Sequence, residues 1–531
     1  MKQLIQFSVK VLVSLSLCLP LTIGCKTESD VVFENYAPYL EEITISDLSK
    51  GYLDGSFTIE RVVGDYLKRI EKLDKSGPML NSVIIVNPDA LEIARALDRE
   101  LSEGKVRGPM HGIPVILKDN LDTYDKMPTT AGAVALKNSI APKDSRIAQM
   151  LREAGAVIIA KANLSEWANF RSKFSSSGWS GVGGQTKNPY ILDRNPCGSS
   201  SGSAVAVSAN LCALAIGTET NGSIVCPSNN NGIVGLKPTV GLLSRSGIIP
   251  ISFTQDTPGP MGRVVADVAI ALGVMTGVDS SDLKTLNPDA KFLKDYTQFL
   301  NIDGLKGKRI GRLKNISGYH HRVDTLMDSA VEYIKSAGAQ VVDIQFPLPA
   351  GSGAASFQIM LYEFKDGLNK YFASLGESAV VKNMDELIAF NLKDSVELRY
   401  FDQNLLITAN EKGPIDSPEY KELLDRMFKA IREDGIDKVM SENNLDLLIA
   451  PTGSPAWKTD PINGDKFMGG SSSYAAISGY PSITVPMGFI DRLPVGISFV
   501  GRAWSEPLLI EAAYSFEQKT KQRRAPQYFA K

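Results

Sequence analysis

Residues 197–226 read CGSSSGSAVAVSANLCALAIGTETNGSIVC, and this stretch decides how the chain folds. Two Gly/Ser-rich turns enclose an apolar run of small residues, AVAVSANLCALAIG. The Gly/Ser-rich composition begins upstream, near residue 172, and such a composition is typical of a flexible linker. However, Trp179 and Tyr190 interrupt it, and apolar segments flank it. We therefore interpret residues 172–203 as a buried, structured loop system.

Outward from this stretch, helix-like and strand-like patterns alternate. Helical spacing covers 57–75, 91–104 and 146–156, and apolar runs typical of strands cover 81–87, 113–120 and 156–163. A helix–Gly–strand unit follows at 323–345, and three more strand candidates lie at 445–452, 481–489 and 494–502. Long polar helices dominate the block at about 355–440. This alternation predicts an α/β fold, in which the helical block is an insertion between sheet-forming halves.

Composition narrows the function classes. The 531 residues exceed one ordinary core, so one elaborated domain or two domains are both open. Hydrophobic residues make up 43% and charged residues 22%, which are ordinary globular values. The 57 basic and 59 acidic residues leave a net charge of −2, and nothing in this balance indicates a nucleic-acid partner.

The N-terminus has the pattern of an export signal. Two lysines precede an apolar run at 11–23, which is shorter than the roughly 20 residues that span a bilayer. The string LTIGC at 21–25 resembles a bacterial lipobox, although its leucine stands one place early, and the resemblance implies lipidation of Cys25. We expect residues 1–24 to be a signal peptide and 25–56 an N-terminal tether. The protein would be extracytoplasmic and held to a membrane by its lipid, with ordinary signal cleavage or a retained anchor as alternatives.

The remaining cysteines and the histidines argue against two other kinds of site. Without Cys18 and Cys25 the folded body has an odd number of cysteines, which argues against a disulfide framework. They are Cys197, Cys212 and Cys226. The chain has three histidines and neither an HExxH nor a CxxC motif, so we expect no metal and no cofactor.

A serine hydrolase needs a base, and histidine is a poor candidate here. His320 and His321 lie in a polar stretch typical of the surface, and His111 is expected to be structural. The string GSSSG at 198–202 formally matches a nucleophile elbow, which would make Ser200 the nucleophile of an α/β-hydrolase, but no strand precedes it. The other available base is a lysine at the end of the apolar strand IPVILK.

Three blocks together carry a family resemblance. They are GPMHGIPVILKDN at 108–120, CGSSSGSAVAVSA at 197–209 and GTETNGSIVCPSNNNGIVGLKPTVGLLSRSGIIP at 217–250. In this order they resemble the amidase-signature family, and the resemblance extends over about 57–520. It implies one catalytic domain at 57–525, built on a large mixed β-sheet covered by helices on both faces. The helical block at 355–440 would be an insertion in that domain.

The resemblance also implies a Ser-Ser-Lys triad. It identifies Lys118 as the base, Ser199, after a cis peptide bond, as the proton relay, and Ser223 as the nucleophile. Ser200 is a supporting candidate beside the relay. The oxyanion hole would be formed by the backbone N–H groups of Thr220, Asn221, Gly222 and Ser223.

The proposed base must be neutral at physiological pH. A free lysine has a pKa near 10.4, and burial among neutral hydroxyls is able to lower it to roughly 7–8. An ion-paired carboxylate would oppose this shift. We therefore expect neither Asp119 nor Asp122 to contact the Lys118 ammonium directly.

The substrate expectation is an amide. The peptide-amidase branch is most similar, because its members have related E-T-x-G-S-I-V-C-P and N-L-S-E-W-A-N-F segments. This implies hydrolysis of C-terminal peptide amides or similar neutral primary amides, with small aliphatic, aryl or N-acyl amides as alternatives. A solute-binding lipoprotein is the non-enzyme alternative. The S-x-x-K match at 281–284 has no K-T-G or S-D-N partner, so a penicillin-binding enzyme is poorly supported.

Overall fold

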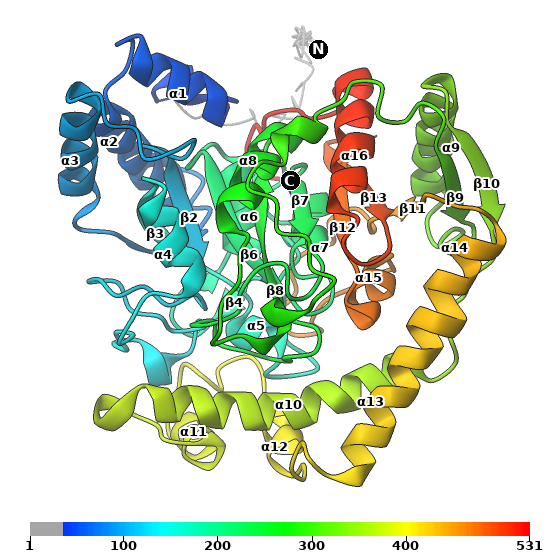
Figure 1. Ribbon diagram of the computed structural model, residues 1–531. Helices are drawn as coiled ribbons and strands as arrows, with labels where there is room; N and C mark the ends of the chain where they lie inside the picture. The colour runs from blue at the N-terminus through cyan, green and yellow to red at the C-terminus, as the bar shows by residue number, and fades with distance from the viewer. Residues whose placement is uncertain (1–35) are drawn as a thin grey trace, which may run out of the picture.

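The computed structural model of the chain describes residues 36–531 (Figure 1). The expected signal peptide at 1–24 and the expected lipidation of Cys25 lie outside the described residues. Within 36–531, no helix is long and apolar enough to cross a membrane.

One large mixed sheet organises the molecule. Its strands run in the order β1-β3-β2-β6-β8-β7-β12-β13-β11-β9-β10, and β4 and β5 form a separate two-stranded ribbon. The strands are β1 (Val83–Val86), β2 (Pro114–Lys118), β3 (Val157–Ala162), β4 (Trp179–Ser180), β5 (Gly184–Gln185), β6 (Leu214–Glu219), β7 (Val234–Lys237), β8 (Thr257–Gly262), β9 (Arg309–Leu313), β10 (Gln340–Ile344), β11 (Leu447–Pro451), β12 (Ser482–Ile490) and β13 (Leu493–Val500).

Parallel pairing is confined to two parts of the sheet. β2 pairs in parallel with both β3 and β6, and β9 pairs in parallel with both β10 and β11. The strands between these groups are antiparallel. β2, β3, β6 and β11 are buried along their full length, as expected for central strands covered on both faces.

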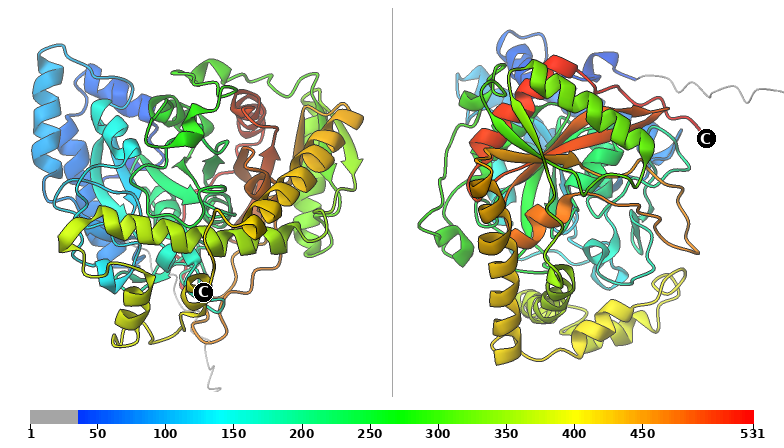
Figure 2. Two further views of the ribbon diagram at one scale, coloured as in Figure 1. Left: turned by 60° about the horizontal axis from the view of Figure 1, so that its bottom comes forward. Right: turned by 90° about the vertical axis from the view of Figure 1, so that its right-hand side faces the viewer.

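Helices cover both faces of this sheet (Figures 1 and 2). They are α1 (Ile45–Leu53), α2 (Ile59–Arg69), α3 (Ala90–Ser102), α4 (Arg146–Glu153), α5 (Glu166–Asn169), α6 (Ser201–Ser208), α7 (Val225–Asn230), α8 (Val265–Met275), α9 (His321–Ser336), α10 (Ser352–Ser374), α11 (Met384–Asn391), α12 (Asn404–Asn410), α13 (Pro418–Ile431), α14 (Lys438–Glu442), α15 (Ser472–Ser478) and α16 (Glu506–Thr520). The expected α/β class and the mixed, helix-covered sheet are therefore confirmed.

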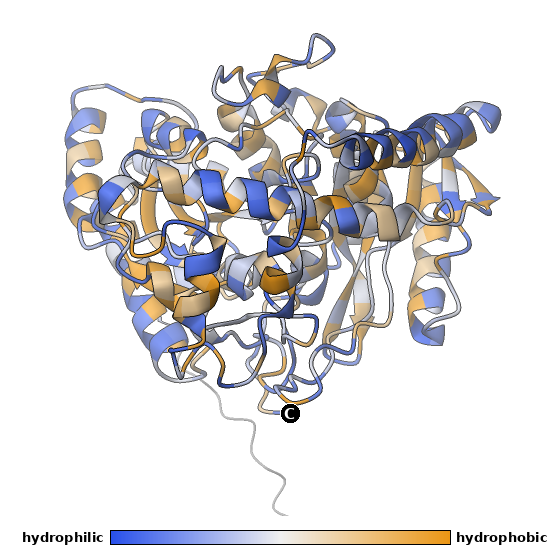
Figure 3. Cartoon of the chain, turned by 90° about the horizontal axis from the view of Figure 1, so that it is seen from below, coloured by the Kyte–Doolittle hydropathy of each residue, from blue (hydrophilic) through white to orange (hydrophobic). Residues whose placement is uncertain are grey.

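The helical block is an insertion between β10 and β11. Helices α10 to α13 lie together below the sheet in Figure 1, and Figure 2 shows the same arrangement from two other sides. Figure 3 looks at this side directly, where hydrophilic and hydrophobic residues alternate along the helices. This pattern is typical of helices that pack one face and expose the other.

Part of the expected tether is instead folded onto the domain. From residue 36 the chain enters α1, and Ile45 and Leu48 of this helix are buried in the main core. The Ile45 N–H donates to Asp267 Oδ1 at 2.9 Å, and Glu42 forms an ion pair with Arg523 at 2.7 Å. The apolar face of α1 packs on the main core, and polar contacts hold the segment to the domain. Residues 36–56 therefore belong to the folded body.

The Gly/Ser-rich stretch is ordered, as expected. Most residues between 176 and 203 are buried, and Trp179 and Tyr190 pack inside the protein. The apolar run after it divides into α6 and β6, which the sequence did not separate because the residues are small and uniformly apolar. The Gly/Ser turn before α6 and the one after β6 therefore lie at the same end of the central strands.

Candidate active site

Lys118 occupies the end of the central strand β2. It is the last residue of the strand, and its side chain is 0% exposed. Its Nζ donates to Ser199 Oγ at 2.7 Å, to Thr218 Oγ1 at 2.8 Å and to the Thr218 carbonyl at 3.2 Å. The amine is thus held among neutral oxygen atoms.

Burial lowers the pKa of Lys118 to about 7, although the negative charges of Asp256 and Glu219 oppose this shift. Neither acidic neighbour in the sequence touches the amine. Asp119 accepts a hydrogen bond from Thr130, and Asp122 accepts one from Tyr371 at 2.9 Å. Within residues 36–531, the expectation that neither Asp119 nor Asp122 contacts the ammonium is confirmed.

The loop before α6 brings Ser199 to this lysine. The peptide bond between Gly198 and Ser199 is cis, as the family resemblance implied. Ser200 lies beside it, where its Oγ donates to the Thr218 carbonyl at 3.0 Å and accepts from the Thr218 N–H at 3.2 Å. Ser200 therefore fixes the loop to β6 and makes no hydrogen bond to Lys118 in the part of the chain that the structure describes.

Ser223 lies in the turn between β6 and α7. Glu219 Oε2 accepts the N–H groups of Ile224 and Val225 at 2.8 and 3.0 Å, which closes the turn from below. Gly222 has φ +84°, a conformation that favours glycine, and a Cβ there would lie 3.0 Å from Ser472 Oγ. The turn is therefore tightly determined.

The two serine segments touch through their backbones. The Ser200 N–H donates to the Ser223 carbonyl at 3.1 Å. Ser223 is 8% exposed, so its hydroxyl is at the edge of the buried site. Among the described residues, no hydrogen bond joins Ser223 Oγ to Ser199 Oγ. The structure thus forms the Lys118–Ser199 contact and places the third residue next to it.

The turn also offers hydrogen-bond donors. Within residues 36–531, the backbone N–H groups of Thr220, Asn221, Gly222 and Ser223 have no acceptor. The side chains around them are fixed. Thr220 Oγ1 donates to the half-buried Asp256 at 2.5 Å, and Asn221 Oδ1 accepts from Ser472 at 2.8 Å. Free N–H groups on a rigid turn are able to bind a negatively charged oxygen.

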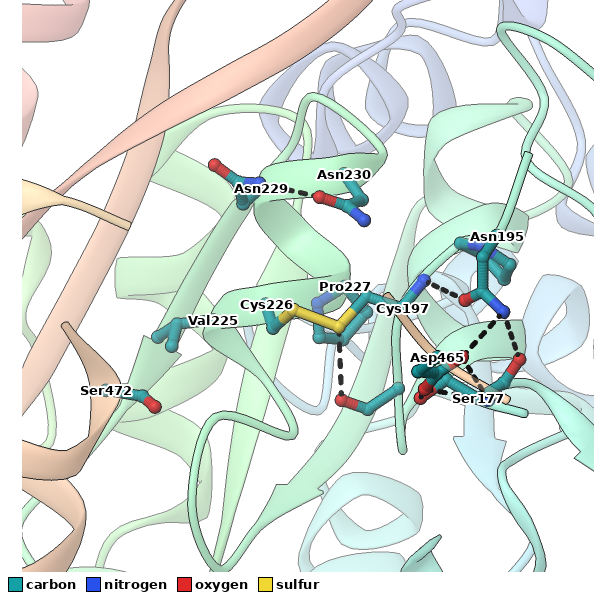
Figure 4. The surroundings of a disulfide bond; sticks show 12 residues. Ser177, Asn195, Cys197, Val225, Cys226, Pro227, Asn229, Asn230, Asp465 and Ser472 are labelled. Atoms are coloured by element: carbon teal, nitrogen blue, oxygen red, sulfur yellow. Dashed lines mark hydrogen bonds between the residues drawn. A yellow bond between two sulfur atoms is a disulfide. The ribbon is translucent and has the colours of Figure 1, made fainter. Parts of the chain in front are cut away.

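A disulfide links Cys197 to Cys226, and this corrects the expectation from cysteine parity. The pair joins the two serine segments, with Cα atoms 6.0 Å apart (Figure 4). Cys212 is free and buried. Parity was misleading because an odd total still allows one pair and one buried thiol.

The site has partners that sequence reasoning missed. Thr218 accepts a hydrogen bond from Lys118, and Glu219 caps the turn that contains Ser223. Both lie within the quoted stretch, but their roles depend on the register of β6 beside β2, where Leu117 lies opposite Ile216. The presence of Thr-Glu at the end of an apolar run was the available signal.

His111 and His321 have the places that their sequence context indicated, whereas His320 is half-buried. His111 is buried, and its Nε2 lies 3.2 Å from the Leu97 carbonyl. His320 and His321 lie at the start of α9, beside the part of the sheet that is far from Lys118. Residues 36–531 contain no group of three His, Cys, Asp or Glu side chains that could hold a metal ion.

An elaborated mixed sheet, with a buried lysine and a serine in contact at the end of a central strand, places the chain among the α/β hydrolytic enzymes. The Amidase family profile matches residues 61–510, which is most of the chain. The chain therefore belongs to the amidase-signature family and is an amide hydrolase.

Individual relatives agree with this assignment. A solved peptide amidase in complex with the competitive inhibitor chymostatin is 48% identical, with a TM-score of 0.89, over 92% of this chain and 99% of that one. The native peptide amidase from Stenotrophomonas maltophilia is 47% identical, with a TM-score of 0.88, over 93% and 100%. A probable amidase of Arabidopsis thaliana is 40% identical over 92% of each chain. The solute-binding receptor alternative has no support among these relatives.

Proposed function

We propose that this enzyme hydrolyses C-terminal amides of peptides, or similar neutral primary amides, to the free acid and ammonia. The observation that carries the proposal is the 2.7 Å contact between the buried Lys118 Nζ and Ser199 Oγ, with Ser223 beside them. Relatives described as peptide amidases, at 47–48% identity over nearly their full length, support the substrate class.

The catalytic roles that the family resemblance implied are supported by the Lys118–Ser199 contact and by the proton balance. With its pKa lowered to about 7, a substantial fraction of Lys118 is neutral at pH 7 and able to accept a proton. Ser223 Oγ attacks the amide carbonyl and passes its proton to Ser199, which passes its own to Lys118. The Ser199–Ser223 contact would close to hydrogen-bond distance when substrate binds, since such contacts are often loose in unliganded enzymes.

The second half of the reaction uses the same relay in reverse. The proton on Lys118 returns through Ser199 to the leaving nitrogen, which departs as ammonia and leaves an acyl-enzyme on Ser223. Water then attacks this ester, with the relay again accepting and returning a proton. The N–H groups of residues 220–223 hold the oxyanion in both tetrahedral intermediates.

The surroundings of the nucleophile favour a neutral substrate. Val225 and Cys226, which follow Ser223 closely, are apolar, and Cys226 is held in the disulfide. Residues 223–230, which form the turn and α7, contain no arginine or lysine. A carboxylate in the substrate would find no such partner in this turn.

We further propose that the protein works in an oxidising compartment. The Cys197–Cys226 disulfide supports export, because such bonds persist outside the reducing cytosol. Cellular fractionation that found the mature protein only in the cytosol, with both thiols free, would contradict this.

Ammonia release tests the substrate proposal directly. A panel of amidated peptides, their free acids, and simple aliphatic and aryl amides would be compared by kcat/KM. We expect the amidated peptides to give the highest values and the free acids to give no ammonia from the C-terminus. Equal or higher kcat/KM values for simple amides would contradict the peptide-amide proposal and favour small aliphatic or aryl amides as substrates.

Substitution of the proposed nucleophile tests the mechanism. Ser223→Ala should abolish acylation, measured as loss of labelling by a fluorophosphonate probe and loss of ammonia release. The matched control is Ser203→Ala, a buried serine of α6 that bonds only the Ile216 carbonyl among the described residues. Retained activity in Ser223→Ala would end the nucleophile assignment.

A further inference from the structure

The two serine segments are joined by a covalent bond as well as by hydrogen bonds. Cys197 stands two residues before Ser199, and Cys226 stands three residues after Ser223. The disulfide between them spans 29 positions of sequence and crosses directly between the two turns (Figure 4). The bond therefore closes a ring that contains both proposed serines.

This bond lies in a built environment. Both sulfur-bearing side chains are buried and pack against Trp457. Asn195 Oδ1 accepts the Cys197 N–H at 2.8 Å, and Asn195 Nδ2 donates to Asp465 at 3.2 Å. Asp465 also accepts from Trp457 Nε1 at 3.1 Å. The loop that follows β11 thus holds the Cys197 side of the ring in place.

The Cys226 side is fixed at the base of α7. The Cys226 N–H donates to the Gly222 carbonyl at 2.8 Å. Asn231 Nδ2 donates to the Pro196 carbonyl at 2.9 Å and to the Pro227 carbonyl at 2.7 Å, which are neighbours of the two cysteines. Because these hydrogen bonds also link the segments, we expect the fold to survive loss of the disulfide.

These hydrogen bonds do not fix the distance between the hydroxyls of Ser199 and Ser223. No hydrogen bond joins Ser199 Oγ to Ser223 Oγ among the described residues, whereas proton transfer needs them within about 2.6–3.2 Å. A misplacement of about 1 Å costs on the order of a hundredfold in rate. A constraint that limits relative movement of the two turns acts on this distance.

We propose that the Cys197–Cys226 disulfide is a positioning element for catalysis, which sets the approach of Ser223 to Ser199. Its role is to hold Ser199 and Ser223 at the separation that proton transfer needs, and we expect the protein to remain folded without it. This inference rests on the proposed catalytic roles of the two serines. Loss of the bond should lower kcat about 10- to 100-fold with little change in KM.

Reduction offers a reversible test. A dithiol such as dithiothreitol donates two electrons and two protons to the S–S bond, which gives the Cys197 and Cys226 thiols, and is itself oxidised to a cyclic disulfide. The purified protein would be assayed oxidised, reduced, and reoxidised after removal of the dithiol. Thiol counting would confirm that two thiols appear and disappear.

A double variant makes the test independent of access to the buried bond. Cys197→Ser with Cys226→Ser should show the reduced kcat without dithiol, and dithiol should not change it further. Cys212→Ala is the matched control, because Cys212 is buried but unpaired, and it should keep the response of the parent protein to dithiol.

Two results would overturn the proposal. One is an unchanged kcat in the folded, fully reduced protein and in the double variant. The other is a fall in kcat that occurs only with unfolding, seen as loss of the native circular dichroism at the assay temperature. Each assay would use the amide with the highest turnover, so the result does not depend on substrate class. Retained activity in Ser223→Ala would contradict the proposed function, whatever the disulfide experiments show. The two failures are therefore distinguishable.

Discussion

At the residue scale, the protonation of Lys118 is set by burial. Its amine contacts hydroxyl and carbonyl oxygens only, and the acidic groups that raise its pKa act from beyond hydrogen-bond contact. A direct carboxylate partner would hold the lysine charged and unable to accept a proton. The structure therefore combines a buried amine with neutral acceptors, the arrangement that a lysine base needs.

This arrangement predicts the pH profile. With the pKa of Lys118 lowered to about 7, kcat/KM should fall on acidification below about pH 7, by about tenfold per pH unit at the limit. The fall occurs towards low pH because protonation removes the base. Initial rates from pH 5 to 9, with circular dichroism at each pH, measure this. A flat profile down to pH 5 in folded protein would contradict a lysine base.

Substitution of Glu219 should change the pKa of Lys118. Its charge raises the pKa of Lys118, and its Oε2 caps the Ser223 turn. Glu219→Gln keeps an acceptor oxygen but removes the charge, so the acid limb should move to lower pH while the plateau kcat stays within about threefold. Glu219→Ala also removes both hydrogen bonds and should lower the plateau at least about tenfold. An unmoved acid limb in Glu219→Gln would show that this charge does not act on the base.

Sequence reasoning brought Lys118 and Ser199 together but did not find the residues that support them. The position of Lys118 at a strand end and the two Gly/Ser turns were readable from the printed residues, and the Lys118–Ser199 contact is present. The family resemblance, rather than spacing, identified the roles. The Thr218 contacts depend on how β6 aligns with β2, and the disulfide depends on how the loop before α6 meets α7 in the folded protein.

At the element scale, the helical insertion is fastened to the core by a buried charge cluster. Arg171 lies 3.1 Å from Glu166 and 3.2 Å from Glu397, which belongs to the insertion. All three side chains are almost fully buried. Burial and the nearby charge of Glu397 raise the pKa of Glu166 well above its usual value, because two acids share one arginine in this cluster.

This cluster predicts an asymmetric response to substitution. Arg171→Met leaves two buried acids without a cation and should destabilise the protein by about 3–5 kcal/mol. Glu397→Gln keeps an oxygen for the Val134 N–H and leaves a one-to-one pair, so its cost should be much smaller. Thermal unfolding of both variants at one pH measures the difference. Equal destabilisation would show that the charge balance of the cluster is not what fastens the insertion.

The elements themselves were predicted unevenly, for a physical reason. Strands with strong apolar runs, such as β2, β3 and β12, and helices with a clear apolar face, such as α2 and α3, matched their expected ranges. β7 reads VGLK and is followed by Pro238, and β8 reads TPGPMG, so the glycines and prolines in and beside these strands suggest turns. They are strands because neighbours on both sides supply the pairing.

At the scale of the whole molecule, the segment at 36–56 links Arg523 to the central elements of the domain. Arg523 near the C-terminus pairs with Glu42 and also donates to the carbonyls of Ser208, the last residue of α6, and of Gly232, which follows α7. Arg263 donates to the Ile43 carbonyl at 2.5 Å. The helices that flank the proposed serines are therefore supported by residues close to both termini.

Removing this segment should consequently weaken the whole fold. Burial of Ile45 and Leu48 contributes about 3–6 kcal/mol, and two arginines lose partners when the segment is absent. In a chain of this size about 1 kcal/mol corresponds to about 1 °C, so a protein beginning at residue 57 should have a Tm lower by about 3–6 °C than one beginning at residue 36. Differential scanning calorimetry of the two proteins compares them directly. Equal Tm values would mean that residues 36–56 lie on the domain without stabilising it, and that the first expectation of a tether describes their energetics better than the contacts do.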